Sequence, residues 1–246
     1  MVENIALSVS FPCSGWDNHL YSTHKLLFGE IVLSAGVGLA LVPSKKDCQA
    51  ISSLLCECEG SGIELAFSLN TSNSIAHLSL MQASFDQQQT AIDLLQELDF
   101  QALESTAIGQ FLRQPMKVVD ISVWATKIVF LNFSLSPELS QLHCDVANLW
   151  LPKALRSSAD PQSFSDISEG QKQSISTTGY PFSYEQYLPH ITLAHLKDGN
   201  GSAEKIGLMN DLIKTLLPQA IRFERLVAFA VEPLGLCRQI IREWQI

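Results

Sequence analysis

The sequence predicts an α+β fold of two pseudo-symmetric lobes, each a mostly antiparallel sheet with helices on its outer face. Short apolar, β-branched runs alternate with longer segments in which apolar residues have helical spacing. In addition, a strand-like run with a His-x-Ser/Thr pattern occurs once in each half, at 74–81 and 187–196, and a helix-like segment follows each. No linker separates the halves. We therefore expect a single two-lobed domain over 1–246, with the two histidine strands facing each other across a groove.

The first half of the chain is expected to supply most of one lobe. Ser44 is placed to cap a helix that runs to about residue 59, and Asp86 is placed to cap the next helix. Glycines 60 and 62 would end the first of these helices. Strands are predicted at 2–11, 36–43, 63–69 and about 75–84.

The second half repeats the theme. Ser136 followed by Pro137 favours a helix start, with serine as the cap and proline in the first turn, and Ser202 starts another helix. Residues 157–179 are rich in Ser, Asp, Gln and Gly and poor in large apolar groups, which predicts a flexible loop leading to the second histidine strand. Strands are predicted at 116–124, 127–135, 222–232 and 237–244.

Composition narrows the class of protein. The chain has 246 residues and a formal net charge of −9, which disfavours electrostatic capture of long nucleic acid but permits a small anionic substrate. The N-terminus has no basic region of a signal peptide, and no apolar run reaches the ~18 residues of a membrane span. Six scattered cysteines in a chain this large indicate reduced thiols, so we expect a cytoplasmic protein.

The two His-x-hydroxyl strands are the candidate site. Side chains alternate along a strand, so His190 and Thr192 point to one face, as do His77 and Ser79. Two facing imidazoles suit paired acid–base catalysis, because an unperturbed histidine titrates near ~6.5 and one ring can be neutral while the other is charged. The neighbouring hydroxyls could hold a phosphate. The alternatives are two histidines satisfied by neighbours, or metal ligands, although no third ligand lies at a tight spacing such as H-E-x-x-H.

The strings HLSL and PHITLA resemble the paired His-x-Thr/Ser motifs of the 2H phosphoesterase superfamily, which includes RNA 2′–5′ ligase-like proteins and 2′,3′-cyclic phosphodiesterases. The resemblance implies a two-lobed fold and RNA-processing chemistry without metal or cofactor. It also implies that His77 and His190 are the acid and base, that Ser79 and Thr192 bind the phosphate, and that the partner is a nucleotide or RNA terminus with a cyclic phosphate.

These observations lead to one hypothesis and its rivals. The hypothesis is a metal-independent phosphoesterase that hydrolyses a 2′,3′-cyclic phosphate or 2′–5′ phosphodiester of RNA or a small nucleotide. The rivals are a non-catalytic module that binds a nucleotide or RNA end, and an RNA 2′–5′ ligase. The sequence leaves open which histidine is the base, the physiological substrate and the oligomeric state.

Three further features lie outside the two triplets. Tyr184 and Tyr187 precede the second motif and could stack on a nucleobase, although aromatics at such positions more often anchor a loop onto the body of the protein. His143, within a helical pattern, is expected to pack or to sit at the surface. An uninterrupted strand would place His195 on the face opposite His190, so His195 is not expected to be catalytic.

Overall fold

The computed structural model describes residues 35–97, 106–124, 127–155, 167–197, 202–232 and 236–246. All of them belong to one compact unit, 32–246. The strand predicted at 2–11 lies outside the described residues, so the single domain over 1–246 stays a prediction. Within the described ranges, no helix combines the length and the apolar composition that crossing a membrane requires.

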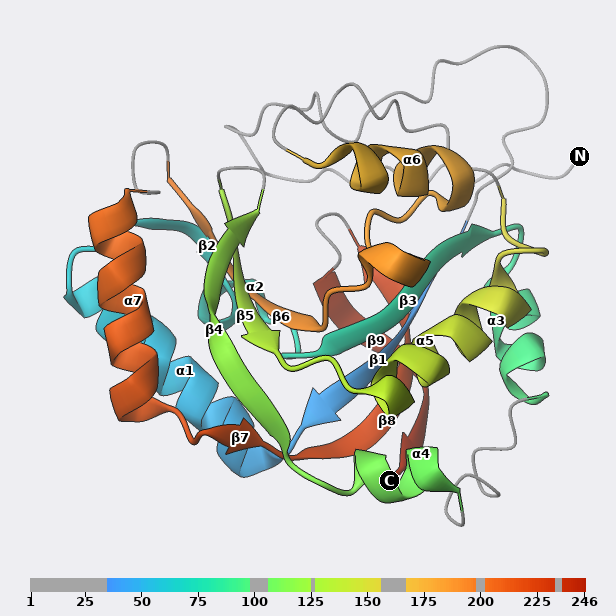
Figure 1. The fold of residues 1–246 in the computed structure, drawn as a ribbon, viewed down its shortest axis with the longest axis horizontal. Helices are drawn as coiled ribbons and strands as arrows, with labels where there is room; N and C mark the ends of the chain where they lie inside the picture. The colour runs from blue at the N-terminus through green and yellow to red at the C-terminus, as the bar shows by residue number, and fades with distance from the viewer. Residues whose placement is uncertain (1–34, 98–105, 125–126, 156–166, 198–201, 233–235) are drawn as a thin grey trace, which may run out of the picture. The chain divides into compact units, whose positions relative to one another are not determined.

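The described part of the chain forms an antiparallel sheet of nine strands (Figure 1). Every strand pair in it is antiparallel. Together with the helices, this confirms the predicted α+β class. The strands are β1 Ala35–Pro43, β2 Leu65–Ser68, β3 Leu78–Phe85, β4 Met116–Trp124, β5 Ile128–Phe133, β6 His190–Leu196, β7 Ala220–Ile221, β8 Phe223–Glu232 and β9 Leu236–Gln245.

The strand order divides the sheet into two halves that meet at the histidine strands. One half runs β7-β4-β5-β6, with β2 also paired to β6, and the other runs β3-β1-β8-β9. The halves are joined edge to edge, because β3 and β6 are direct neighbours that share one registered pair, Leu78 with Ile191. The two motifs therefore lie side by side at this junction.

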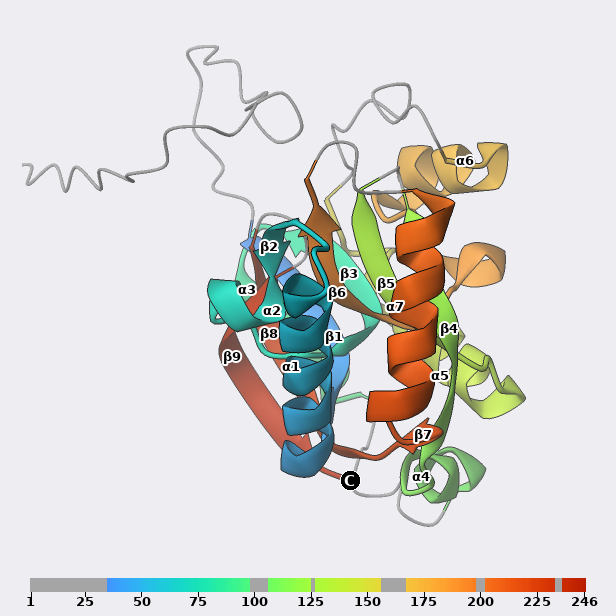
Figure 2. The ribbon, with the colours of Figure 1, turned by 90° about the vertical axis from the view of Figure 1, so that its left-hand side faces the viewer.

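Seven helices accompany the sheet in the described residues. Helices α1 and α7 pack against each other (Figure 2), while α3 and α4 both pack against α5. Ser44, Ser136 and Ser202 each accept a hydrogen bond from a backbone N–H of the first turn, so three predicted caps are confirmed. The helices are α1 Lys45–Gly60, α2 Leu69–Ser72, α3 Gln88–Leu95, α4 Ala107–Leu112, α5 Pro137–Trp150, α6 Glu169–Thr178 and α7 Ala203–Leu216.

Two predictions about helices were wrong. Within the loop predicted at 157–179, residues 169–178 form α6, while 157–166 lie outside the described residues. A capping box between Ser168 and Gln171 starts α6, and Gly179 ends it at a φ of 78°, so the helix is defined by its ends more than by an apolar stripe. Asp86 does not cap α3, whose N-cap position is Gln87 and whose cap has no side-chain hydrogen bond.

Candidate active site

The two His-x-hydroxyl triplets meet at a single point of the sheet. Leu78 and Ile191, the middle residues of the triplets, are cross-strand partners and are fully buried. Because the pairing is antiparallel, His77 and Thr192 lie to one side of this pair, and Ser79 and His190 lie to the other. The alternation of side chains turns these four residues away from the face that Leu78 and Ile191 occupy.

His77 is oriented by its own backbone and contacts an aromatic ring. Its Nδ1 donates a hydrogen bond to the carbonyl oxygen of Ile75 at 2.8 Å, which assigns the ring proton to Nδ1, since a carbonyl can only accept. The imidazole lies tilted against Phe229, with ring centroids 4.8 Å apart. The residue is 7% exposed.

His190 is held in the same way. Its Nδ1 donates to the carbonyl oxygen of Leu188 at 2.7 Å, again two residues earlier in the chain. The ring stacks on Phe130 with centroids 3.8 Å apart, and Phe182 meets it edge-on at 4.9 Å. Burial lowers the pKa of His190 to about 4, the hydrogen bond to Leu188 opposes that shift, and a charge on nearby His77 adds to it.

The hydrogen bond that both histidines make through Nδ1 determines which ring nitrogen can take part in proton transfer. In both rings Nδ1–H is committed to the carbonyl two residues back, so the titratable nitrogen is Nε2. Nε2 carries a lone pair when the ring is neutral and a proton when it is charged, which are the forms a general base and a general acid need. The orienting contacts thus leave both histidines equipped for proton transfer.

The two hydroxyl residues differ in their surroundings. Ser79 is 7% exposed, and its Oγ accepts a hydrogen bond from Nε2 of Gln82 at 3.0 Å. The Ser79 hydroxyl proton is not used in that bond. The Ser79 side chain also hydrogen-bonds the Tyr180 hydroxyl: burial raises the pKa of Tyr180, and this hydrogen bond opposes the rise. Thr192 is more open than either histidine and faces Phe130 across the β5–β6 pair.

Asn132 is a neighbour of His190 that sequence reasoning missed. The two residues form a cross-strand pair, and the hydrogen bond from Phe133 N–H to Pro189 oxygen makes it the closely spaced type of pair. Nδ2 of Asn132 donates to Oδ1 of Asp120 at 2.7 Å and to Oγ of Ser122 at 2.8 Å. Nothing local in the sequence marks Asn132, because its importance comes from register across two strands.

The unused oxygen of Asn132 has a defined orientation. The carboxylate of Asp120 can only accept, so the nitrogen of the amide must face it and Oδ1 must point the other way. In the part of the chain that the structure describes, this buried Oδ1 has no hydrogen-bond partner. A buried acceptor beside His190 is therefore left unsatisfied, which costs free energy unless a donor reaches it.

The two tyrosines predicted as possible base-stacking residues behave differently from each other. Tyr187 is 6% exposed, its ring is stacked on His143 at 4.0 Å, and its hydroxyl donates to the carbonyl oxygen of Ser79 at 3.3 Å. Its burial and this stacking correct the prediction that Tyr187 stacks on a nucleobase. Tyr187 instead anchors the segment before β6 and offers no open ring face. Tyr184 is half-buried, and its hydroxyl donates to Oδ1 of Asn148 at 3.1 Å.

His195 lies on an unexpected face of the sheet. The β5–β6 register shifts between Val129 and Phe130, so that Leu193 is an extra residue in β6. His195 is then the partner of Ile128, which shares a face of β5 with Phe130 and Asn132. The bulge therefore brings His195 to the same face as His190, and the assumption of an uninterrupted strand was wrong.

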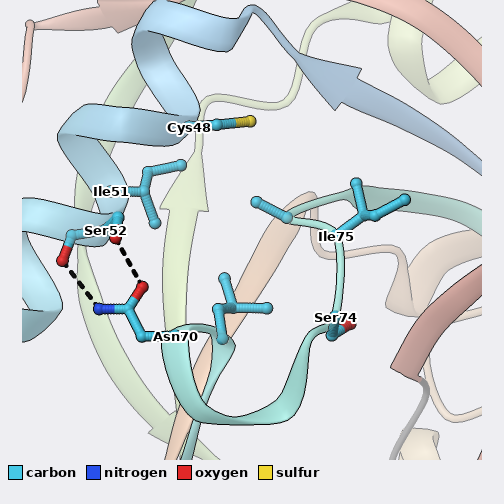
Figure 3. A pocket seen from close by; sticks show the side chains of 8 residues that line it. Cys48, Ile51, Ser52, Asn70, Ser74 and Ile75 are labelled. Atoms are coloured by element: carbon cyan, nitrogen blue, oxygen red, sulfur yellow. Dashed lines mark hydrogen bonds between the residues drawn. The ribbon is translucent and has the colours of Figure 1, made fainter.

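A separate hollow of about 240 Å³ lies between α1 and the segment that leads into β3 (Figure 3). Hydrogen bonds between Ser52 and Asn70 close one side of it. It borders the start of the first motif but does not include the four motif residues, so it is distinct from the candidate site. Its described lining residues are Cys48, Ile51, Ser52, Leu69, Asn70, Ser74, Ile75 and Ala76.

No protein-family model and no curated protein matches this chain. Among solved structures, it is similar to Kluyveromyces marxianus Usb1, with 13% identity, a TM-score of 0.44, and coverage of 86% of this chain and 97% of that one. The same Usb1 with uridine monophosphate gives 12% identity, a TM-score of 0.42, and coverage of 88% and 99%. Escherichia coli LigT complexed with phosphate gives 13% identity, a TM-score of 0.43, and coverage of 86% and 97%.

Proposed function

We propose that this chain is a metal-independent phosphoesterase that hydrolyses a 2′,3′-cyclic phosphate or a 2′–5′ phosphodiester of RNA or a small nucleotide. The observation that carries the proposal is the matched tethering of His77 and His190, each by Nδ1–H to the carbonyl two residues earlier, on strands paired at Leu78 and Ile191. A histidine that served packing alone would have no reason to repeat this arrangement in both halves of the fold. The similarity of HLSL and PHITLA to the 2H phosphoesterase motifs supports the same proposal.

The proposed step moves two protons and breaks one bond. Nε2 of the neutral histidine takes a proton from a water molecule as the water oxygen attacks phosphorus. The bond from phosphorus to a ribose oxygen breaks, and Nε2–H of the protonated histidine gives its proton to that oxygen. One ring ends charged and the other neutral, so the pair exchanges roles and must release a proton and regain one before the next turnover.

The lowered pKa of His190 favours it as the base. A pKa of about 4 leaves this ring uncharged at neutral pH in the free protein, which is the state a general base requires. His77 would then be the acid. A phosphate dianion or diester between the rings would stabilise the charged form of either histidine and so would favour one proton shared by the pair.

Ser79 and Thr192 are proposed to donate hydrogen bonds to the non-bridging phosphate oxygens. They flank the pair Leu78–Ile191 on opposite sides, as the histidines do. Donors placed where negative charge grows during attack stabilise the transition state, and removing one typically costs ~10²–10³ in turnover. Tyr184, which is half-buried beside this segment, stays a candidate for contact with a nucleobase.

The test is turnover of a 2′,3′-cyclic nucleotide by the purified full chain in the presence of EDTA. His77→Ala and His190→Ala are each expected to lose at least ~10²-fold in kcat, the contribution typical of a general acid or base. Thr192→Val should lose activity as well, whereas Thr177→Val, which removes an exposed hydroxyl on α6, should not. Unchanged turnover in both histidine variants would remove the assignment.

The rival functions give different outcomes in the same experiment. Saturable binding of the nucleotide without any product would indicate a binding module. Joining of RNA ends, rather than release of a monoester, would indicate a 2′–5′ ligase. A steep loss of binding with salt would indicate contacts to many phosphates of a long RNA, which the charge of −9 disfavours.

A further inference from the structure

His143 lies at the centre of α5 and is fully buried, with both ring nitrogens hydrogen-bonded. Its Nδ1 donates to the carbonyl oxygen of Leu80 at 2.5 Å, and its Nε2 accepts from the backbone N–H of Tyr184 at 2.8 Å. A carbonyl can only accept and an amide N–H can only donate. The two partners therefore fix His143 as the neutral ring with its proton on Nδ1.

The two partners of His143 lie beside different His-x-hydroxyl triplets. Leu80 follows Ser79 on β3, next to the first His-x-hydroxyl triplet. Tyr184 begins the 3₁₀ turn Tyr184–Gln186, which leads directly to β6 and the second triplet. One imidazole thus donates to the first histidine segment and accepts from the second, although these segments are more than a hundred residues apart in sequence.

A second set of contacts joins the same two segments. The His143 ring stacks on Tyr187 with centroids 4.0 Å apart and planes inclined by 6°, and the Tyr187 hydroxyl donates to the carbonyl oxygen of Ser79 at 3.3 Å. Tyr187 is adjacent in the chain to Leu188, whose carbonyl oxygen orients His190. A change in the position of His143 would therefore be transmitted to the group that orients a proposed catalytic histidine.

The backbone of Tyr184 needs such a support. Its φ is 53°, in the left-handed region that residues with a Cβ adopt only at a cost. In that conformation its N–H points to Nε2 of His143, which satisfies the donor. Without this acceptor, the backbone of Tyr184 would be expected to leave the left-handed conformation, and residues 184–188 would move with it.

We propose that His143 is a positioning residue that holds the two His-x-hydroxyl segments at a fixed separation. Its imidazole is required because one group must donate to β3 and accept from the turn before β6, while its flat face packs on Tyr187. The role of His143 in the fold stands on its own contacts, and its effect on turnover rests on the proposed function.

Two substitutions separate the polar role from simple packing. His143→Phe keeps a flat ring for Tyr187 but loses both hydrogen bonds. His143→Gln keeps one donor and one acceptor. Val146→Ala is the matched control, because Val146 is fully buried on the same helix and its truncation loses packing but no hydrogen bond.

The first measurement is hydrogen exchange of the Tyr184 amide, with the ¹⁵N shifts of the imidazoles, in the full chain. His143→Phe should speed exchange of this amide by at least about tenfold, the loss expected for one buried hydrogen bond, and should disturb the Nδ1–H tautomer of His190. His143→Gln should restore most of the protection. Val146→Ala should leave both signals as in the unmodified protein.

The second measurement is turnover of a 2′,3′-cyclic nucleotide at a temperature at which every variant is folded. His143→Phe should lower kcat by about tenfold or more with a smaller change in KM, and His143→Gln should recover part of the lost kcat.

Equal loss of kcat in Val146→Ala would overturn the positioning role, as would unchanged Tyr184 exchange in His143→Phe. If His143→Phe does not fold, rapid Tyr184 exchange in a fully active His143→Gln protein would overturn it. If the unmodified protein does not turn over the nucleotide, the proposed function fails, whereas the exchange and ¹⁵N results still decide the role of His143.

Discussion

The ring of Phe229 lies directly over Gly38, one strand away, and from there it reaches the imidazole of His77. A Cβ built on Gly38 would lie 2.3 Å from Cζ of Phe229, closer than two carbon atoms can approach. Phe229 is fully buried and contacts His77 at a centroid distance of 4.8 Å. The missing side chain at position 38 thus makes room for the ring that supports the first proposed catalytic histidine.

Gly38→Ala is therefore expected to be destabilising. The new methyl must displace a rigid, buried ring, and overpacking of this kind costs about 1–3 kcal/mol. Denaturant unfolding should show a lower midpoint with an unchanged slope, and turnover should fall because His77 loses its support.

Gly207→Ala is the matched control for that substitution. Gly207 is exposed in the middle of α7, and a Cβ there meets no described atom within 4 Å. Because alanine is the better helix former, this change should stabilise the protein by up to about 1 kcal/mol. A Gly38→Ala protein as stable as the Gly207→Ala protein would contradict the packing described around Phe229.

Acid should destabilise the folded chain in a defined window. Burial lowers the pKa of His190 and of His195 to about 4, and it also lowers the pKa of His143. The unfolded chain, with imidazoles near ~6.5, then binds more protons than the folded chain between about pH 6.5 and 4. Stability is complete above that window and is lost as the pH falls through it, by up to about 1.4 kcal/mol per unit for each group.

Unfolding free energies measured from pH 8 to pH 4 test this expectation. The slope should be close to zero at the alkaline end and positive, with stability rising with pH, below about 6.5. His143→Gln should show a shallower slope, because one of the three buried groups no longer titrates. A flat profile down to pH 5 would mean that these rings are not buried as neutral groups.

Asn132→Asp should be destabilising at neutral pH. The amide donates to both Asp120 and Ser122, and a carboxylate at position 132 would lose both donors and place a negative charge beside Asp120. A lost partner and a like charge at a buried position together cost about 2 kcal/mol or more. The difference in unfolding free energy between this variant and the unmodified protein should shrink on mild acidification, because protonation of the new carboxyl restores a donor.

The control is Asn148→Asp, at an exposed position of α5. The oxygen of Asn148 already accepts from the Tyr184 hydroxyl, and a carboxylate would accept equally well. We expect a change within about 0.5 kcal/mol, as is usual for surface substitutions. Equal losses in the two variants, by chemical denaturation at pH 7.5, would show that the Asp120–Asn132–Ser122 contacts do not matter to stability.

The sequence was most informative where structure depends on neighbours in the chain. Ser44, Ser136 and Ser202 cap the helices they were predicted to cap, since a cap needs only its own first turn. The β4 and β5 strands were predicted at nearly the correct bounds from apolar patterns. Helix α6 was missed because it buries few apolar side chains, and its capping box and Gly179 were the signals that could have identified it.

The parts that could not be predicted depend on register between strands. The bulge at Leu193 exists only relative to β5, so no pattern within β6 shows that His195 changes face. The same holds for Asn132, which is placed beside His190 by pairing with β6, and for His143, whose partners lie on two other segments. Local alternation placed His190 and Thr192 on one face correctly because no bulge lies between them.

Replacing His195, which lies on the same face of the sheet as His190, tests whether proton transfer depends on the His77–His190 pair alone. Its Nε2 is buried and has no hydrogen-bond partner among the described residues, its pKa is lowered by burial and then by the charge of Lys127, and its ring meets the edge of Phe67 at 5.9 Å. His195→Leu removes an unsatisfied polar atom from apolar surroundings, so stability at pH 7 should be unchanged or higher by about 1 kcal/mol, with a larger gain near pH 5. Turnover of a 2′,3′-cyclic nucleotide should stay at the unmodified level, whereas His190→Ala should lower it by at least ~10²-fold. If His195→Leu removes turnover while remaining folded, the proton transfers at this face involve His195, and the pairing of His77 with His190 is not the whole site.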